Sequence, residues 1–233
     1  MLRYFKQLKV FFLALAIVSS IIIYFIYSAL KVEKALPVWT PNRVDTALVD
    51  PSIQYKKKHH KIADFELINQ NGKVITQDTY QGKIYVTDFF FTTCQSICPI
   101  MTDQMSRIQN HIIDDDEVLL LSHSVTPEID SVAQLKRYAI EKGVNDDKWN
   151  LVTGDRKQIY DLARKSYLVV KTDDTEDYGM IHTENFALID KEKRIRGLYN
   201  GVSPAAIDSL ITDIGRLKKE YEPKKNWFNS IFN

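Results

Sequence analysis

The strongest constraint on this chain is an uncharged run close to its N-terminus. The run "VFFLALAIVSSIIIYFIYSAL", residues 10–30, holds 21 residues without a charge. At about 1.5 Å per residue, a helix of this length crosses a hydrocarbon core of roughly 30 Å. Arg3, Lys6 and Lys9 precede the run, and positively charged flanks stay in the cytoplasm. We therefore predict a cytoplasmic stub over residues 1–9, a single-pass anchor in the lipid bilayer of the inner membrane, and a periplasmic, extracytoplasmic remainder.

A cleaved signal peptide is the alternative interpretation of this run. The apolar part of a signal peptide usually covers about 7 to 15 residues and ends in an Ala-x-Ala-like cleavage site. Here the run is longer, and only the weak match "YSALKVEKA" stands at its end. The sequence favours an uncleaved anchor. Because no cysteine follows the span closely, we expect no lipoprotein anchor.

The rest of the chain has the composition of one globular domain with an appendage. Hydrophobic residues make up 45% of the sequence, enough for a core, and the net charge is +1. Because neither sign of charge is in excess, we expect no nucleic-acid partner. Residues 31–61 mix prolines and charges with few periodic apolar positions, which is typical of a tether. We predict a tether over 31–61, a globular domain over 62–220 and a tail over 221–233.

Strand and helix patterns alternate through this domain. Residues 61–83 alternate apolar and polar positions around Asn71 and Gly72, which predicts a β-hairpin. The run "KIYVTDFFF", residues 83–91, is typical of a central strand that is covered on both faces. Further strands are predicted at 117–125 and 149–154 and as a closing pair within 184–201, and helices at 99–112, 127–143, 155–167 and 203–222.

Cys94 and Cys98 are the two cysteines of the chain. They lie between the predicted central strand and a helix whose start is marked by Pro99. A thiol pair at such a junction, within alternating strands and helices, is the arrangement of a thioredoxin-like domain. The predicted fold is therefore α/β: a thioredoxin-like domain with an N-terminal β-hairpin extension, preceded by a single transmembrane helix. Outside the cytoplasm an idle thiol pair is expected to oxidise, which disfavours two inert core cysteines.

The spacing of the two cysteines permits a disulfide or a metal site. On one helix face their Cβ atoms would lie about 5 to 6 Å apart, whereas a disulfide needs about 3.5 to 4.5 Å. A metal bonded to each sulfur at roughly 2.3 Å fits this separation more easily. Both outcomes stay open, with metal favoured, and the helix N-terminus favours the thiolate that either chemistry needs. A disulfide that only stabilises would close a very short loop and gain little.

A metal would need a further ligand, and the chain has five histidines. His59 and His60 lie in the predicted tether and are expected to be solvated. His111 ends a helix, where a cation meets the negative end of the helix dipole. His123, at the end of a buried strand, is expected to be a hydrogen-bonded residue near the core. His182 stands in the loop before the closing strand pair, which in a thioredoxin-like sheet faces the cysteine-bearing helix start, so it is the best candidate ligand.

Four segments in order give the chain a family resemblance: "FFFTTCQSICPIM", "SVTPEIDSVAQLKRYA", "WNLVTG" and "HTENFALIDKEKRIRGLY". With them, residues 62–220 resemble the SCO/SenC family of membrane-anchored, thioredoxin-like copper proteins. The resemblance implies that Cys94, Cys98 and His182 bind copper, as Cu(I) and, with the imidazole, also as Cu(II). It also implies a partner, the CuA-bearing subunit of cytochrome c oxidase or another copper or thiol protein. Copper would be delivered to that partner, or its cysteines would be reduced.

The sequence departs from the family pattern at three positions. Gln95 stands where members commonly carry proline, and Thr126 where they carry aspartate. Ile181 replaces the aspartate that usually precedes the ligand histidine. This last departure can change copper affinity, because such an acid would steer the imidazole. Asp88 and the acidic loop "TDDTEDY", residues 172–178, are candidates to compensate or to contact a partner, although a merely solvated loop is the favoured interpretation of that stretch.

Two other functions are considered beside copper delivery. The first is an enzyme, a thiol–disulfide oxidoreductase in which Cys94 attacks a disulfide and Cys98 resolves the mixed disulfide. The second is a peroxidase of the same fold, in which one cysteine reduces peroxide and the other resolves it. The spacing of the two cysteines and the resemblance favour the copper carrier, with the oxidoreductase as the main alternative.

Overall fold

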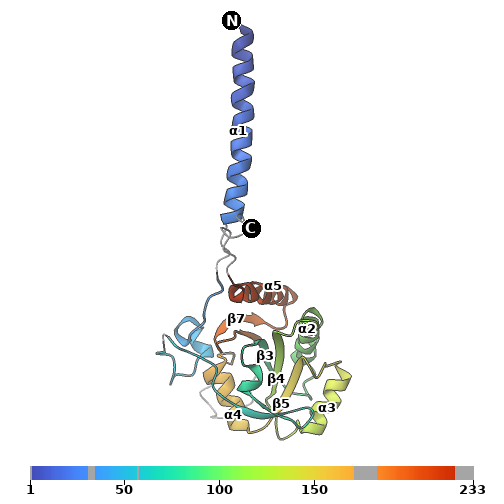
Figure 1. Cartoon of the computed structure of the whole chain (residues 1–233). Coiled ribbons are helices and arrows are strands. Elements are labelled where there is room, and N and C mark those ends of the chain that lie inside the picture. Colours follow the sequence, from blue (N-terminus) through green and yellow to red (C-terminus); the bar gives the residue numbers. More distant parts are fainter. Residues whose placement is uncertain (1, 31–34, 57, 171–182, 224–233) are drawn as a thin grey trace. The chain divides into compact units, whose positions relative to one another are not determined.

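The computed structural model describes residues 2–30, 35–56, 58–170 and 183–223 (Figure 1). Its contacts divide the chain into two compact units, residues 1–35 and residues 36–233. The first unit contains helix α1, Leu2–Leu30. A 20-residue stretch of α1, Leu8–Tyr27, is long and apolar enough to cross a membrane, a property that anchors share with N-terminal signal sequences. The predicted single N-terminal apolar helix is confirmed.

The second unit is built on a mixed sheet of seven strands in the order β2-β1-β5-β4-β3-β6-β7. Strands β3, β4 and β5 run parallel, and the other neighbours pair antiparallel. This is the predicted α/β thioredoxin-like fold. The strands are β1 (Glu66–Asn69), β2 (Val74–Thr76), β3 (Ile84–Phe90), β4 (Val118–Ser124), β5 (Trp149–Thr153), β6 (Asn185–Ile189) and β7 (Ile195–Asn200).

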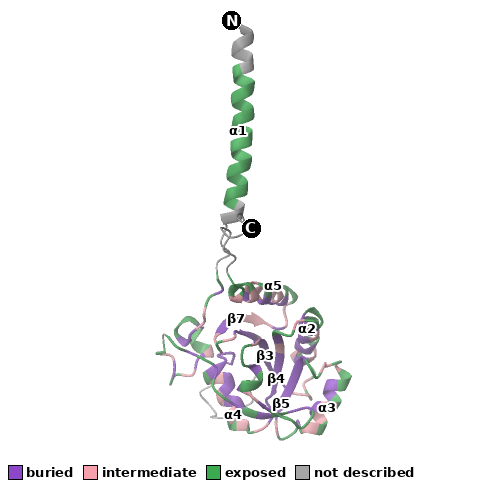
Figure 2. Cartoon of the chain, in the orientation of Figure 1, coloured by how far each residue is buried: buried purple, intermediate pink, exposed green. Residues whose placement is uncertain are grey.

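Helices cover both faces of this sheet. Helices α2, α3 and α5 pack on one face, and α4 packs on the other together with the π turn that follows it. The sheet is therefore the buried middle layer (Figure 2). The bounds are α2 (Ile97–His111), α3 (Val132–Glu141), α4 (Arg156–Asp161), the π turn (Leu162–Ser166) and α5 (Pro204–Tyr221), with 3₁₀ turns at Pro41–Arg43, Thr46–Leu48 and Gln77–Tyr80.

Strand β3 is the central strand that the sequence predicts, and all of its residues are buried. Val86 and Phe90 belong to the apolar cluster beneath α2, α3 and α5. Tyr85 and Phe89 belong to the cluster on the α4 side. A strand covered on both faces needs apolar side chains in both directions. Strands β4 and β6 flank β3 on either side. The loop that leads from β3 to Cys94 therefore starts from a strand that is hydrogen-bonded along both edges.

The predicted N-terminal hairpin is also confirmed. Strands β1 and β2 pair antiparallel, with Leu67 opposite Ile75. Gly72 in the turn between them has a φ of 73°, a conformation that glycine adopts without steric cost. Strand β1 then pairs with β5, so the hairpin extends the sheet at one edge.

Two helices differ from the prediction. Helix α3 begins at Val132 and not at Pro127, because the Ser131 hydroxyl oxygen caps it by accepting the Gln134 N–H (3.3 Å). The helix predicted over residues 155–167 ends at Asp161 and continues as a π turn. Such turns are rare, and a single one carries no sequence period by which it could be found.

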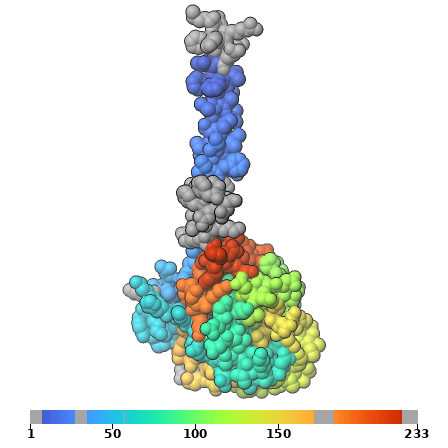
Figure 3. Space-filling view, viewed as in Figure 1, coloured from blue at the N-terminus to red at the C-terminus, as the bar shows by residue number. Residues whose placement is uncertain are grey.

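The stretch predicted as a tether differs from that prediction from residue 36 onward. Val44, Val49 and Ile53 are buried in the same apolar cluster as α4. Figure 3 shows this part of the chain, in light blue, lying on the body of the second unit. Its apolar residues stand in short 3₁₀ turns and bends, which follow neither the helical nor the strand period. Their burial is therefore not visible as a sequence pattern.

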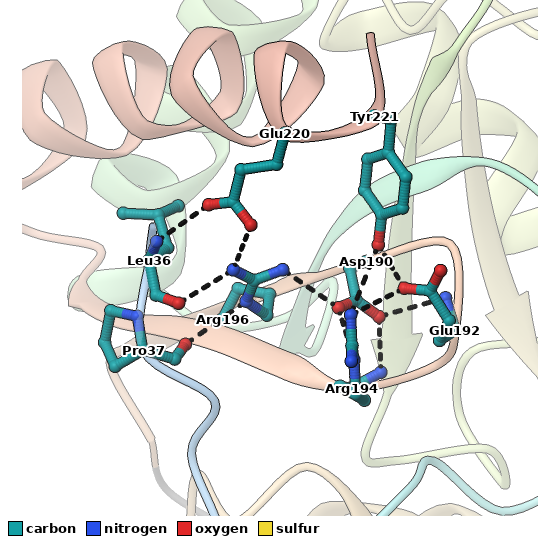
Figure 4. Close-up of polar contacts among 8 residues, drawn as sticks. All are labelled: Leu36, Pro37, Asp190, Glu192, Arg194, Arg196, Glu220 and Tyr221. Atoms are coloured by element: carbon teal, nitrogen blue, oxygen red, sulfur yellow. Dashed lines mark hydrogen bonds and ion pairs between the residues drawn. The ribbon is translucent and has the colours of Figure 1, made fainter. Parts of the chain in front are cut away.

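Arg196 of β7 ties the beginning of the second unit to its end (Figure 4). Its guanidinium, 3% exposed, donates to the C=O groups of Leu36 (2.7 Å) and Pro37 (3.2 Å). It also pairs with the carboxylates of Glu220 on α5 (2.6 Å) and Asp190 after β6 (3.1 Å). Glu220 in turn accepts the Leu36 N–H (2.7 Å). This group of residues, the Arg196 cluster, fixes the point at which the chain enters the fold.

Candidate functional site

The two cysteines lie where the chain passes from β3 to α2. Strand β3 ends at Phe90, and a turn follows in which the Cys94 N–H donates to the Phe91 C=O (3.3 Å). Cys98 lies in the first turn of α2 and is 3% exposed. Cys94 is half-buried in the preceding loop, and both thiols are free. The predicted position of the pair, at a strand tip and a helix start, is correct.

The sulfur of Cys94 lies at the N-terminal end of α2. The backbone N–H of Cys98 donates to the Cys94 Sγ (3.4 Å), and the Ser96 Oγ lies 3.6 Å from the same sulfur. Ser96 is the N-cap residue but makes no side-chain capping hydrogen bond. The sulfur therefore accepts one of the N–H groups that the first turn of a helix leaves without a partner. A thiolate accepts better than a thiol, and the helix dipole favours it.

The surroundings make the two thiols chemically different. Burial raises the pKa of Cys94, but hydrogen bonds from the Cys98 thiol and from the N–H groups of Cys98 and Ser96 stabilise its thiolate and lower the pKa to about 7. Burial, followed by the hydrogen bond that it makes to Cys94, raises the pKa of Cys98 to about 12. Near neutral pH, a substantial fraction of Cys94 is thiolate, whereas Cys98 is protonated.

Asp130 is a site residue that the sequence analysis did not single out. Its carboxylate is fully buried and accepts hydrogen bonds from the backbone N–H and the hydroxyl of Thr92, two residues before Cys94. Ser124 and Thr126 also donate to it. The available signal was the pair of hydroxyl residues just before it in "SVTPEID", because a buried carboxylate needs several donors.

Asp88 of β3 is a buried carboxyl on the same face of the sheet as Cys98. Burial raises its pKa to about 7, although a hydrogen bond from Ser122 lowers it in part. Ser122 itself accepts the indole N–H of Trp149 (2.8 Å). The other carboxyl oxygen, Oδ1, has no hydrogen-bond partner within the described part of the chain. Asp88 is thus a core residue, and the pKa of Cys98 is raised in part by its charge.

His123 is the near-core histidine that the sequence predicts. Its ring is fully buried, lies 3.2 Å from the Thr87 hydroxyl through Nδ1 and stacks on Phe89 at 4.7 Å between centroids. Burial lowers its pKa to about 3. The rings around His123 belong to the apolar cluster on the α4 side of the sheet, whereas Cys98 belongs to the cluster on the opposite side. His123 therefore lies on the other face of the sheet from Cys98.

Three other histidines lie away from the thiols. The prediction that both tether histidines are solvated is wrong for His60, which is 6% exposed and bonds through Nε2 to the Ser166 C=O (2.7 Å). That carbonyl belongs to the π turn, and burial lowers the pKa of His60. His59 is exposed, as predicted, and His111 is the exposed last residue of α2.

His182, the predicted third ligand, lies outside the described residues. The nearest described residue after it, Thr183, donates from its hydroxyl to the Val169 C=O. Asn185 donates to the same carbonyl (3.2 Å). Within residues 2–30, 35–56, 58–170 and 183–223, no three or more histidine, cysteine or acidic side chains form a group that could hold a metal. In that part of the chain, Cys94 and Cys98 supply two potential metal ligands, and no third ligand is grouped with them.

Most of the second unit is similar to proteins of one known family. The family model described as SCO1/SenC matches residues 53–218. A crystal structure of a SCO1/SenC family lipoprotein from Bacillus anthracis is 30% identical, with a TM-score of 0.61, and the match covers 68% of this chain and 95% of that one.

Two further structures of relatives carry information on thiol and metal chemistry. BsSco, a member of the Sco family of cytochrome c oxidase assembly proteins with a disulfide switch, is 33% identical at a TM-score of 0.57, over 67% of this chain and 92% of its own. Arabidopsis thaliana ScoI, solved with copper bound, is 28% identical at a TM-score of 0.53, over 66% of this chain and 98% of its own. With the family model matched over most of the second unit, this chain belongs to the SCO1/SenC family.

Proposed function

We propose that this protein binds one copper ion through the thiolates of Cys94 and Cys98 and the imidazole of His182. The observation that carries the proposal is the hydrogen bond from the Cys98 N–H to the Cys94 Sγ (3.4 Å), which holds the first sulfur at the helix turn that contains the second. Thiolates are soft ligands that select Cu(I), and an added imidazole gives a site that can also hold Cu(II). The copper-bound structure of a relative supports the choice of metal.

The two thiols suit a metal that is carried as cargo. With a pKa of about 7, Cys94 is substantially thiolate at neutral pH and can make the first bond to an arriving ion. Cys98 must lose its proton when it becomes a ligand, because only the thiolate binds. Protonation of Cys98 then favours release, so the ion can pass by ligand exchange to the thiolates of a partner.

The proposed destination is the CuA centre of cytochrome c oxidase. The relative BsSco belongs to a family of cytochrome c oxidase assembly proteins, and we extend that role to this chain. Helix α1 would hold the protein in the inner membrane, with the second unit on the periplasmic side, since Arg3, Lys6 and Lys9 precede the apolar stretch. At the same centre, the protein could instead reduce the cysteines, and that role would use the thiol chemistry of the second candidate function below.

A thiol–disulfide reductase is the second candidate function, favoured by the unequal pKa values of the two thiols. The Cys94 thiolate would attack a target disulfide, form a mixed disulfide and release one target thiolate. The Cys98 thiol would then lose its proton and attack the Cys94 sulfur. This step forms the Cys94–Cys98 disulfide and releases the second target thiolate, so the target gains the two electrons that the pair loses.

The variant His182→Ala separates these functions. The full chain is purified in detergent under reducing conditions, loaded with Cu(I) and analysed for bound copper, and its rate of disulfide reduction is measured in parallel. His111→Ala, which changes an exposed histidine at the end of α2, is the matched control. For a copper carrier, we expect copper affinity to fall at least about tenfold in His182→Ala alone, with the reduction rate unchanged. Full copper binding by His182→Ala would show that the three-ligand site is wrong.

A further inference from the structure

We infer that Asp130 is a positioning residue for Cys94: it holds the turn that presents the Cys94 sulfur to the first turn of α2. The inference rests on the proposed function only in taking Cys94 as the working thiol. It applies equally to copper binding and to thiol exchange.

The Asp130 carboxylate is a buried anion held entirely by neutral donors. It is 0% exposed, and Oδ1 accepts the Thr92 hydroxyl (2.5 Å). Oδ2 accepts the Thr92 N–H (3.2 Å), the Ser124 hydroxyl (2.6 Å) and the Thr126 hydroxyl (3.1 Å). Among the described residues no lysine or arginine forms an ion pair with it. A buried charge without a counter-ion is costly unless its hydrogen bonds are complete, so the carboxylate strongly favours the one loop geometry that supplies all four.

Thr92 transmits this restraint to Cys94. It is the second residue of the turn closed by the Cys94 N–H and the Phe91 C=O (3.3 Å). Its hydroxyl oxygen also accepts a hydrogen bond from the Gln134 side chain on α3 (3.0 Å). Thr92 is thus fixed both by Asp130 and by α3. These contacts fix the backbone direction of the residues that precede Cys94, independently of the hydrogen bond between the Cys94 sulfur and the Cys98 N–H.

The departure from the family pattern at Thr126 fits this arrangement. The threonine hydroxyl donates to Asp130 (3.1 Å), and the Thr126 N–H donates to the Ser124 hydroxyl oxygen (3.2 Å). An aspartate at position 126 would place a second carboxylate beside the first and remove one of its donors. In this chain Thr126 and Asp130 therefore work as a pair.

The test uses two mild variants of the full chain in detergent. Thr92→Val removes the hydroxyl that Asp130 accepts but keeps the side-chain shape and the backbone N–H. Asp130→Asn keeps the size and removes the charge. Asp190→Asn is the matched control, because Asp190 is an equally buried carboxylate that belongs to the Arg196 cluster. Thr92→Ser restores the hydroxyl and serves as a rescue variant.

Two readouts separate positioning from stability. The first is the equilibrium of the Cys94–Cys98 disulfide with reduced glutathione, in which two glutathione molecules are oxidised as the pair is reduced. The second is the thiolate-to-Cu(II) absorption band. We expect Thr92→Val and Asp130→Asn to change the glutathione equilibrium constant at least about threefold and to shift or weaken the band. Thr92→Ser should match wild type, and Asp190→Asn should lower only the thermal midpoint.

The result that overturns the inference is a lowered midpoint in Thr92→Val and Asp130→Asn with both readouts unchanged. Its failure differs from a failure of the proposed function. If the wild-type chain binds no copper while the glutathione equilibrium still responds to Thr92→Val, the copper proposal fails and the role of Asp130 stands. If copper binds normally in every variant and the glutathione equilibrium is unchanged in all of them, the copper proposal stands and the role of Asp130 fails.

Discussion

The backbone N–H of Cys98 donates to the Cys94 Sγ across 3.4 Å, while the Cys98 side chain is buried in the apolar cluster beneath α2. One sulfur is therefore offered to solvent with the help of the helix N-terminus, and the other is held back in the core. Under the proposed function, this asymmetry would make Cys94 the thiol that first meets a metal ion or a target disulfide.

Alkylation by iodoacetamide should distinguish the two thiols. The pKa of Cys94 is lowered to about 7. The rate of Cys94 alkylation should therefore rise as the pH passes through that value and level off about one pH unit above it. Cys98, with its pKa raised to about 12, should stay unmodified over the same range in the folded protein. Timed labelling followed by peptide mass spectrometry measures both sites, and Cys94→Ser is the control. Equal labelling of both cysteines at neutral pH would contradict the assignment.

Replacing Asp88 by asparagine should change the pH dependence of stability. The pKa of Asp88 is raised by burial from 3.8 to about 7, so between these values the folded chain holds a proton that the unfolded chain has lost. The stability of the wild type should therefore fall as the pH rises through this window. Asparagine at position 88 does not titrate, so Asp88→Asn should escape this loss. The free energy of unfolding of Asp88→Asn minus that of wild type should therefore be about 2 to 4 kcal/mol larger at pH 8 than at pH 4.

Denaturant unfolding at the two pH values measures this difference. Asp208→Asn, at an exposed carboxylate of α5 paired with Arg107, is the control and should show little change between them. A pH-independent difference for Asp88→Asn would mean that Asp88 does not titrate in this window.

Truncation of Val49 should reveal whether the segment before β1 is part of the folded domain. Val49 is fully buried, so Val49→Ala should lower the free energy of unfolding by about 2 kcal/mol through lost burial and the cavity left behind. Val74→Ala, at a residue 52% exposed on β2, is the matched control and should be close to neutral. Equal small effects would restore the interpretation of residues 31–61 as a tether.

Removal of the Arg196 guanidinium should loosen the segment at Leu36 and Pro37, where the chain enters the second unit. Arg196→Met leaves the Glu220 carboxylate without its ion-pair partner and weakens the pairing of Asp190, so we expect a loss of about 3 to 5 kcal/mol in the free energy of unfolding. Faster proteolysis within residues 36–56 should accompany it. Arg107→Met, which breaks the exposed pair with Asp208, should cost less than about 1 kcal/mol. Equal proteolysis rates for wild type and Arg196→Met would show that the cluster does not hold this segment.

Regular elements of the fold could be predicted from the sequence because their signals are local. Asn71 and Gly72 mark a hairpin turn, and the apolar run of β3 matches its burial on both faces. The end of α3 could be read from Gly143, whose φ is 66°, and the start of α5 from Ser203, whose hydroxyl oxygen accepts the Ala206 N–H (3.4 Å). Each of these features depends on residues close together in the chain.

The features that escaped prediction depend on distant partners. His60 looks solvated within "KKKHHK", yet its ring meets the Ser166 C=O across 106 positions of sequence. Asp130 is an ordinary turn residue until Thr92, 38 positions earlier, is brought beside it. The thiol pair could be found because both of its members lie in one short motif. The partners that hold its loop could not, because Asp130 lies between β4 and α3, and Gln134 lies on α3.

A mechanical consequence follows from the Arg196 cluster. Any pull exerted through α1 would enter the second unit at Leu36, whose N–H is held by Glu220 and whose C=O is held by Arg196. Strand β7 is at the edge of the sheet, with β6 between it and β3. The first contacts to bear such a load are therefore those that Leu36 makes with Glu220 of α5 and Arg196 of β7, and not those of the turn before Cys94.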